Sequence, residues 1–340
     1  MQQNEYMYTE QTLVNERTMN TDPREQVREE GRVWRSRPRK RAPWRTVLFC
    51  VLALIVAVGI AELTGGIPTR AMRQALPART FALSGHSTLV VNGQSGTLHV
   101  HAGNTNQVTV QATRYAYGLG NDLDDLQVQY AQQGNTLTIT TSESWGVVLG
   151  SRGIDIDVTV PSSVDLNIHG SSNDVNLSGI DGQVSVNTDS GNLRLDNVSG
   201  PLDLSSSSGD IAVTNEHGPL DAHTSSGNIS IDHAAGALDL SSSSGNITLN
   251  AAQVAGQGHL QTDSGNIEFS GTLDPRGTYQ MAASSGNITL KLPADASFQL
   301  ATSADSGDVH NDFSASAVGS GPHANIALKT SSGDIRVQKQ

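Results

Sequence analysis

Apolar residues in the second half of the chain recur in pairs separated by one polar residue. Between residues 175 and 249 these pairs return every nine residues, and from Gly182 to Gly245 a glycine stands two positions before each pair. An i, i+2 pair places two side chains on one face of a short strand, and glycine permits a tight turn that a Cβ would obstruct. The pattern predicts one strand and one turn in every nine residues.

A four-residue motif, Ser-Gly-Asn/Asp-aliphatic (the tetrad), repeats on twice that period. Its copies begin at Ser190, Ser208, Ser226, Ser244, Ser264, Ser285, Ser306 and Ser332. Successive copies are 18 residues apart at first and 20 to 26 apart later. Two strand-turn units make one coil of about 18 residues, and stacked coils form a parallel β-solenoid, or β-helix. We therefore expect an all-β fold with regular solenoid repeats over residues 169–340.

The glycine and the Asn/Asp of each tetrad are expected to form a structural turn ladder, because these residue types favour turns. The ladder comprises Gly191, Asn192, Gly209, Asp210, Gly227, Asn228, Gly245, Asn246, Gly265, Asn266, Gly286, Asn287, Gly307, Asp308, Gly333 and Asp334. Calcium-binding nonapeptide repeats place an Asp two positions before the buried aliphatic residue. Here that position is glycine, as in Gly191 before Leu193, so we expect no metal and no cofactor.

Three aspartates occupy equivalent positions on the second strand of successive coils. Asp203, Asp221 and Asp239 (the acidic row) each stand between two inward aliphatic residues, so they should point outward about 4.8 Å apart. The row is either a solvated, screened line of charges or a weak site for a cation or an amine polymer.

The remainder of the chain divides by composition. Residues 1–45 are polar and are expected to be a disordered cytoplasmic tail with a basic run next to the membrane. Residues 46–63 are apolar, and residues 64–82 are expected to form a stalk. Residues 83–168 have strand patterns without the nine-residue period and are expected to form irregular N-terminal coils of the solenoid.

The apolar segment 46–63 predicts a membrane span. Its only charged residue is Glu62, and 18 residues of helix measure about 27 Å, close to the hydrocarbon thickness of about 30 Å. Basic residues gather before it, which predicts a single-pass membrane protein with a cytoplasmic N-terminus and an extracytoplasmic C-terminal domain. A cleaved signal peptide is the alternative, although its basic region would be about 45 residues long, against the short one of ordinary signals.

Composition excludes several functions. Residues 64–340 hold 11 basic and 25 acidic residues, and aromatic residues make up 4 % of the chain, so nucleic acid is not an expected partner. The single cysteine, Cys50, permits neither an intramolecular disulfide nor a cysteine-built metal site. The sequence contains no recognised catalytic motif, so we do not expect the protein to be an enzyme.

A family resemblance rests on two of these features. Strand-rich segments that end on Val160-Pro161, followed by repeated Ser-Gly-Asp/Asn-Ile turns, resemble the bacterial putative-adhesin family of unknown function, also called toast-rack domains. The resemblance covers about residues 85–337. It implies an envelope-associated β-solenoid with an adhesive, scaffolding or envelope-stress role, and it carries over no catalytic residues.

These observations favour a membrane-anchored, extracytoplasmic β-solenoid that acts as a non-catalytic, adhesin-like binding or scaffolding module of the cell envelope. Its expected partner is an envelope polymer or a surface protein. Two alternatives are a carbohydrate-active enzyme on a β-helix fold and an envelope-stress sensor.

Two features of the last coils complete the sequence picture. Longer spacings near residues 250–258, 270–278 and 311–323 predict loops along one edge, and such loops often form the recognition surface of repeat proteins. The final apolar pair, Ile335 and Val337, predicts an open terminal coil at the end of the chain. Either charged residues protect the edge of this coil and the protein stays monomeric, or the edge pairs end to end with a second copy or an envelope partner.

Overall fold

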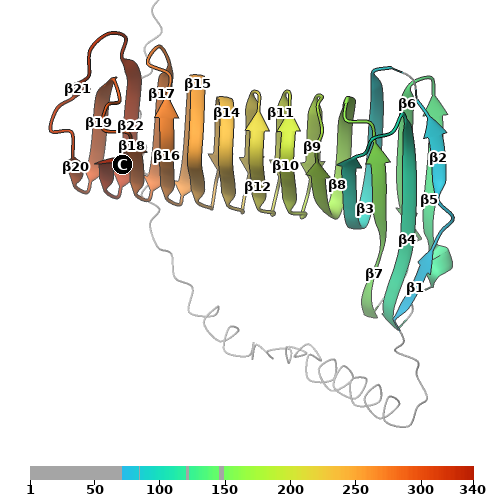
Figure 1. The fold of residues 1–340 in the computed structure, drawn as a ribbon. Coiled ribbons are helices and arrows are strands. Elements are labelled where there is room, and N and C mark those ends of the chain that lie inside the picture. Colours follow the sequence, from blue (N-terminus) through green and yellow to red (C-terminus); the bar gives the residue numbers. More distant parts are fainter. Residues whose placement is uncertain (1–70, 84, 120–121, 145–148) are drawn as a thin grey trace, which may run out of the picture. The chain divides into compact units, whose positions relative to one another are not determined.

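The computed structural model describes residues 71–83, 85–119, 122–144 and 149–340, and these residues form one elongated stack of strands (Figure 1). The irregular region contains β1 (Met72–Ala75), β2 (Arg79–Ala82), β3 (Ser87–Ala102), β4 (Gln107–Leu119), a short 3-10 helix (Leu123–Asp125), β5 (Leu126–Gln133), β6 (Thr136–Glu143) and β7 (Leu149–Val160). The repeats begin with β8 (Val164–Ser178), β9 (Val184–Thr188), β10 (Leu193–Ser199), β11 (Leu202–Ser206), β12 (Ile211–His217), β13 (Leu220–Thr224), β14 (Ile229–Ser242) and β15 (Ile247–Ser264). They continue with β16 (Ile267–Leu273), β17 (Thr278–Ser285), β18 (Ile288–Leu292), β19 (Phe298–Ser306), β20 (Val309–Asn311), β21 (Ala317–Val318), β22 (Ala324–Ser332) and β23 (Ile335–Lys339).

The regular repeats form a parallel β-solenoid with the expected register. Leu193 pairs in register with Ile211 on the next strand of the same sheet, and Leu202 pairs in register with Leu220, so neighbouring coils are offset by 18 residues. The strands that follow the tetrads form the tetrad face, and the other strands form the opposite face. The tetrad face contains β10, β12, β16, β18, β20, β23 and parts of β8, β14 and β15, whereas the opposite face contains β9, β11, β13, β17, β19, β22 and the remaining parts of β8, β14 and β15.

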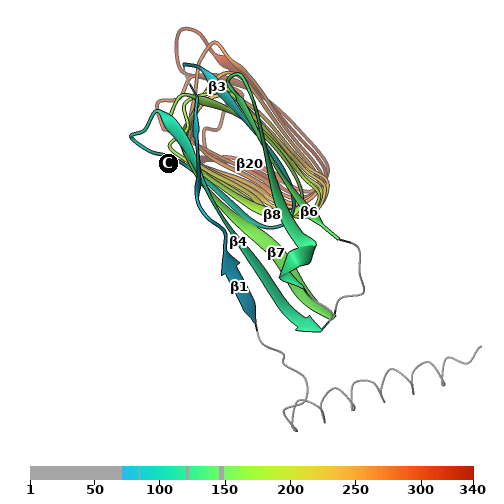
Figure 2. The same ribbon diagram turned by 90° about the vertical axis from the view of Figure 1, so that its right-hand side faces the viewer.

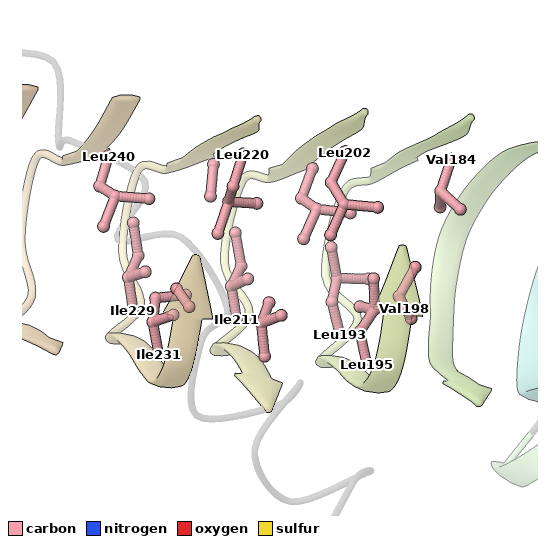
Figure 3. Packing of buried hydrophobic residues seen from close by; sticks show 14 of the residues in the cluster. Val184, Leu193, Leu195, Val198, Leu202, Ile211, Leu220, Ile229, Ile231 and Leu240 are labelled. Carbon is pink, nitrogen blue, oxygen red and sulfur yellow. The ribbon is translucent and has the colours of Figure 1, made fainter. Parts of the chain in front are cut away.

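The core lies between the two faces. Seen along the solenoid axis, the coils superimpose as a flattened ring with two long walls (Figure 2). Leu202 and Leu220 project from the opposite face toward Leu193 and Ile211 of the tetrad face (Figure 3), and all four are at most 2 % exposed. The alternating apolar pattern therefore produces the core because every inward residue stacks on its equivalent in the next coil.

The order of the last coils differs from the order of the chain. β22 lies between β17 and β19, and β23 lies between β18 and β20. The expectation that Ile335 and Val337 form the open terminal coil is therefore wrong, because β19 and β20 form the outermost coil and cover them. Both residues are fully buried.

The irregular N-terminal region is only partly built from coils. β3 pairs in parallel with β6, β7 and β8, as coils require, but β4 pairs antiparallel with β7 and β5 pairs antiparallel with β6. β1 and β2 also pair antiparallel with β4. Residues 72–75 and 79–82 therefore belong to the folded unit rather than to the expected stalk.

The longer connections lie on one edge, as the spacing predicted. Residues 250–258, 270–278 and 311–323 each lead from the tetrad face to the opposite face. The last of them is also structural: Phe313 packs edge to face on Phe298 at 5.0 Å, and the Lys339 ammonium lies 5.0 Å from the Phe313 ring centre. This connection brings the chain back by one coil, so it does not act as a recognition loop alone.

Within the described residues, no helix has the length and hydrophobicity needed to span a membrane. The predicted span, residues 46–63, and the predicted tail, residues 1–45, lie outside the described residues.

Candidate binding groove

The predicted turn ladder forms one continuous line along the tetrad corner. The backbone N–H of each tetrad Asn or Asp donates a hydrogen bond to the side-chain Oδ1 of its equivalent in the adjacent coil, at 2.8–3.1 Å. The line runs from Asp174 to Asn287 and then to Asp334 and Asp308, which follows the exchanged order of the last coils. The side chains therefore satisfy backbone donors of the turns, which is a structural role.

The tetrad glycines are required by close packing between coils. A Cβ on Gly227 would collide with the carbonyl oxygen of Gly209, and the same collision recurs at the other tetrads. A second line, of buried hydroxyls, lies beside them: Ser242 Oγ donates to Gly227 O at 2.9 Å, and Thr262 Oγ1 donates to Gly245 O at 2.9 Å. These hydroxyls were missed in the sequence, although they always stand three residues before a tetrad glycine.

The acidic row has the predicted register on the opposite face. Asp203 lies opposite Asp221, and Asp221 lies opposite Asp239. Asp203 and Asp239 are exposed, whereas Asp221, in the middle, is half-buried. The line of outward side chains continues from Asp239 to His259 and then to Gln280.

Asp221 has the most perturbed environment in the row. Burial raises the pKa of its carboxyl, and the neighbouring carboxylates of Asp239 and Asp203 raise it further, whereas His223 lowers it. His223 Nε2 lies 2.5 Å from Asp221 Oδ1, and His223 Nδ1 is hydrogen-bonded to the Ser241 hydroxyl. The three aspartates therefore repel one another, and the repulsion is greatest at the central position.

A groove of about 600 Å³ runs across the coils beside the acidic row. Its lining comes from β11, β13, β14, β15 and β17 and from the corners that precede them. The lining residues are Pro201, Leu202, Pro219, Leu220, Asp221, Ala237, Leu238, Asp239, Gln257, Gly258, His259, Thr278 and Gln280. The acidic row contributes Asp221 and Asp239 to the groove, and Asp203 lies next to Asp221 just outside the lining.

The groove combines three kinds of surface. Pro201, Pro219 and Ala237 form an exposed apolar band along the corner. Asp221 and Asp239 lie beside that band, and the far end carries polar side chains such as Gln280. Among the lining residues that the structure describes, none is Lys or Arg, and no group of three or more His, Cys, Asp or Glu suited to a metal ion occurs in the described part of the chain. The arrangement suits binding along an extended surface.

One buried ionisable residue was missed by sequence reasoning. Glu216 is 0 % exposed and lies between Val198 of the preceding coil and Ala234 of the next, in the apolar line of that corner. Burial raises the pKa of its carboxyl to about 8, and the backbone N–H of Ala235 opposes the rise. Alignment of the 18-residue repeats could have revealed it as the single acid at an otherwise apolar position.

Comparisons with known proteins agree with this description at the level of the family. The family model described as Toastrack DUF4097 matches residues 86–338. Among solved structures, a putative adhesin from Parabacteroides distasonis is 13 % identical, with 79 % of this chain and 98 % of that chain covered and a TM-score of 0.42. A putative adhesin from Bacteroides fragilis is 16 % identical, with 78 % and 97 % covered and a TM-score of 0.38. A search of curated proteins finds no match.

Proposed function

Because this chain belongs to the Toastrack DUF4097 family, we propose that it is a non-catalytic, adhesin-like binding module of the cell envelope, with the groove on the opposite face as its binding surface. The observation that carries the proposal is the register of the groove. Its lining repeats from coil to coil, so equivalent positions lie at strand spacing, about 4.8 Å. A surface of this kind matches an extended polymer better than it matches a compact small molecule.

Rigidity supports the same role. Each coil is fixed to the next by parallel strand pairing on both faces and by the turn ladder at the corner. The groove is therefore held in one shape before a ligand arrives, and binding does not have to order the surface first.

The test compares two variants of the full chain that carry the same bulk at different places. Ala237→Trp fills the groove. Ala301→Trp places the same side chain on β19, which also belongs to the opposite face but lies outside the groove lining. Binding to an array of purified envelope polysaccharides, peptidoglycan fragments and surface peptides should fall at least tenfold for Ala237→Trp and remain unchanged for Ala301→Trp. Equal binding by both variants would place the binding surface elsewhere.

We also propose that residues 46–63 anchor the chain in the membrane and that the solenoid lies outside the cytoplasm. The apolar length and the basic bias of the sequence support this arrangement. Ser320→Cys in a Cys50→Ser background gives one exposed thiol on the solenoid. A membrane-impermeant maleimide should label it on intact cells, and labelling only after lysis would contradict the proposal.

A further inference from the structure

We infer that the groove takes a cationic peptide segment, with lysine or arginine side chains lying along its apolar band and their charged groups at Asp221 and Asp239. This inference rests on the proposed function, since it names the ligand class for the same groove. It concerns the chemistry of the lining, whereas the proposed function concerns only its location and register.

Charge is the first argument. Asp221 and Asp239 line the groove, Asp203 adds a third carboxylate next to Asp221, and no lining residue that the structure describes is Lys or Arg. The basic side chains beside the row are histidines: His223 pairs with Asp221, and His259 follows Asp239 in the groove. The three carboxylates raise one another's free energy by repulsion, most strongly at half-buried Asp221. A positive group placed between Asp221 and Asp239 would remove that repulsion and form charge-assisted hydrogen bonds.

The apolar band is the second argument, and it distinguishes a peptide from a simple cation. Exposed Pro201, Pro219 and Ala237 stand directly before the buried leucines of their strands and beside the carboxylates. Lysine and arginine have long methylene stems that pack on apolar surface while their charged ends reach polar groups. A metal ion gains nothing from contact with an apolar surface, and the described residues contain no cluster of three side chains that could coordinate it.

The length of the groove is the third argument. Its lining comes from five strands that lie side by side on the opposite face, which gives a span of about 19 Å. An extended peptide covers that distance with about six residues. The far end of the groove carries Gln257, Thr278 and Gln280. Their side chains can form hydrogen bonds with the backbone of a bound peptide, whatever its sequence.

The experiment measures fluorescence anisotropy of a labelled decalysine peptide with the full chain in neutral detergent micelles. Asp221→Asn/Asp239→Asn is compared with Asp189→Asn/Asp263→Asn, which removes the same charge from two exposed residues at the tetrad corner. Decalysine should bind the wild type and weaken as salt increases. The Asp221→Asn/Asp239→Asn variant should bind decalysine about tenfold more weakly than the wild type, as expected for the loss of one half-buried and one exposed ion pair. The Asp189→Asn/Asp263→Asn variant should lose less than twofold in affinity.

Three results would overturn the inference. Equal losses in the two double variants would show attraction by net charge alone. Binding of an amine-bearing glucosamine oligomer in the groove without binding of decalysine would assign the groove to an aminoglycan. Absence of decalysine binding, while Ala237→Trp still abolishes binding to an envelope polymer, would refute the cationic ligand and leave the proposed function intact.

Discussion

Replacing Glu216 should stabilise the solenoid and change how its stability depends on pH. The carboxyl is fully buried in an apolar line, and its pKa rises from an ordinary 4.5 to about 8. Between these two values the unfolded chain has lost the proton and the folded chain keeps it. The free energy of unfolding therefore falls as pH increases through this interval and levels off above about pH 8.

The magnitude follows from the same two values. Each pH unit of difference between folded and unfolded pKa is worth 1.36 kcal/mol, so the interval corresponds to about 5 kcal/mol at high pH and about 3 kcal/mol at pH 7. Glu216→Gln keeps the size and polarity of the side chain but cannot ionise. Its stability should equal that of the wild type at pH 4 and exceed it by about 3 kcal/mol at pH 7.

The assay is urea unfolding of both proteins from pH 4 to pH 9, followed by circular dichroism, with Asp263→Asn as an exposed-acid control. Glu216→Val tests the packing argument separately, since Val198 occupies the equivalent position one coil earlier. Nearby acids and histidines on the flanking strands, Asp196, Asp232 and His233, are exposed or half-buried on the outside of the coils. Parallel pH profiles of wild type and Glu216→Gln would refute the reasoning.

Two further changes test the contacts between coils. Gly227→Ala should cost about 1–3 kcal/mol of unfolding free energy because its Cβ would collide with the Gly209 carbonyl oxygen, whereas Ser226→Ala, at an exposed neighbour, should cost little in the same urea titration. Removal of residues 324–340 should abolish hydrogen-exchange protection in β19–β20, which lose the coil that joins them to the stack. It should only lower protection in β17–β18, which still pair with β15 and β16; protection that persists in β19–β20 would contradict the exchanged order.

The sequence was most informative where each residue's role repeats locally. The tetrad predicted the turn ladder because glycine and Asn/Asp act within their own turn and against an identical turn one coil away. The register of Asp203, Asp221 and Asp239 followed from the same 18-residue period. The period alone was enough to place these residues side by side.

Features that depend on which coil meets which could not be predicted. Ile335 and Val337 have the same pattern as every other apolar pair, so nothing local indicates that their coil is inserted before the outermost one. The antiparallel pairing of β4 with β7 was missed for a related reason: alternation of apolar and polar residues is the same in parallel and antiparallel strands. The groove depends on how corners of different length stand beside one another, which the spacing does not determine.

The exchanged order also explains how the solenoid ends. The inner coil, β22 and β23, carries Leu328, Ile335 and Val337, all at most 1 % exposed. The outermost coil keeps Phe298 and Leu300 at inward positions, but at other inward positions it is polar, with Thr302 paired with Leu328 and Asn311 paired with Val337. The most apolar of the last coils is thus covered, and the free end has less apolar surface to bury against a second copy.

This arrangement predicts that the outer end resists end-to-end association. Asp305, Asp308 and Asp312 are exposed on or just after the outermost coil, and charged edges oppose strand pairing between molecules. β21 additionally pairs antiparallel with the first residues of β19 and covers part of its edge. Light scattering of the full chain in detergent should give a mass independent of concentration, whereas Asp305→Asn/Asp308→Asn with Val309→Ile should begin to associate. Concentration-dependent association of the wild type would show that these charges do not protect the edge, because Val309, 48 % exposed, would then be sufficient to drive contact.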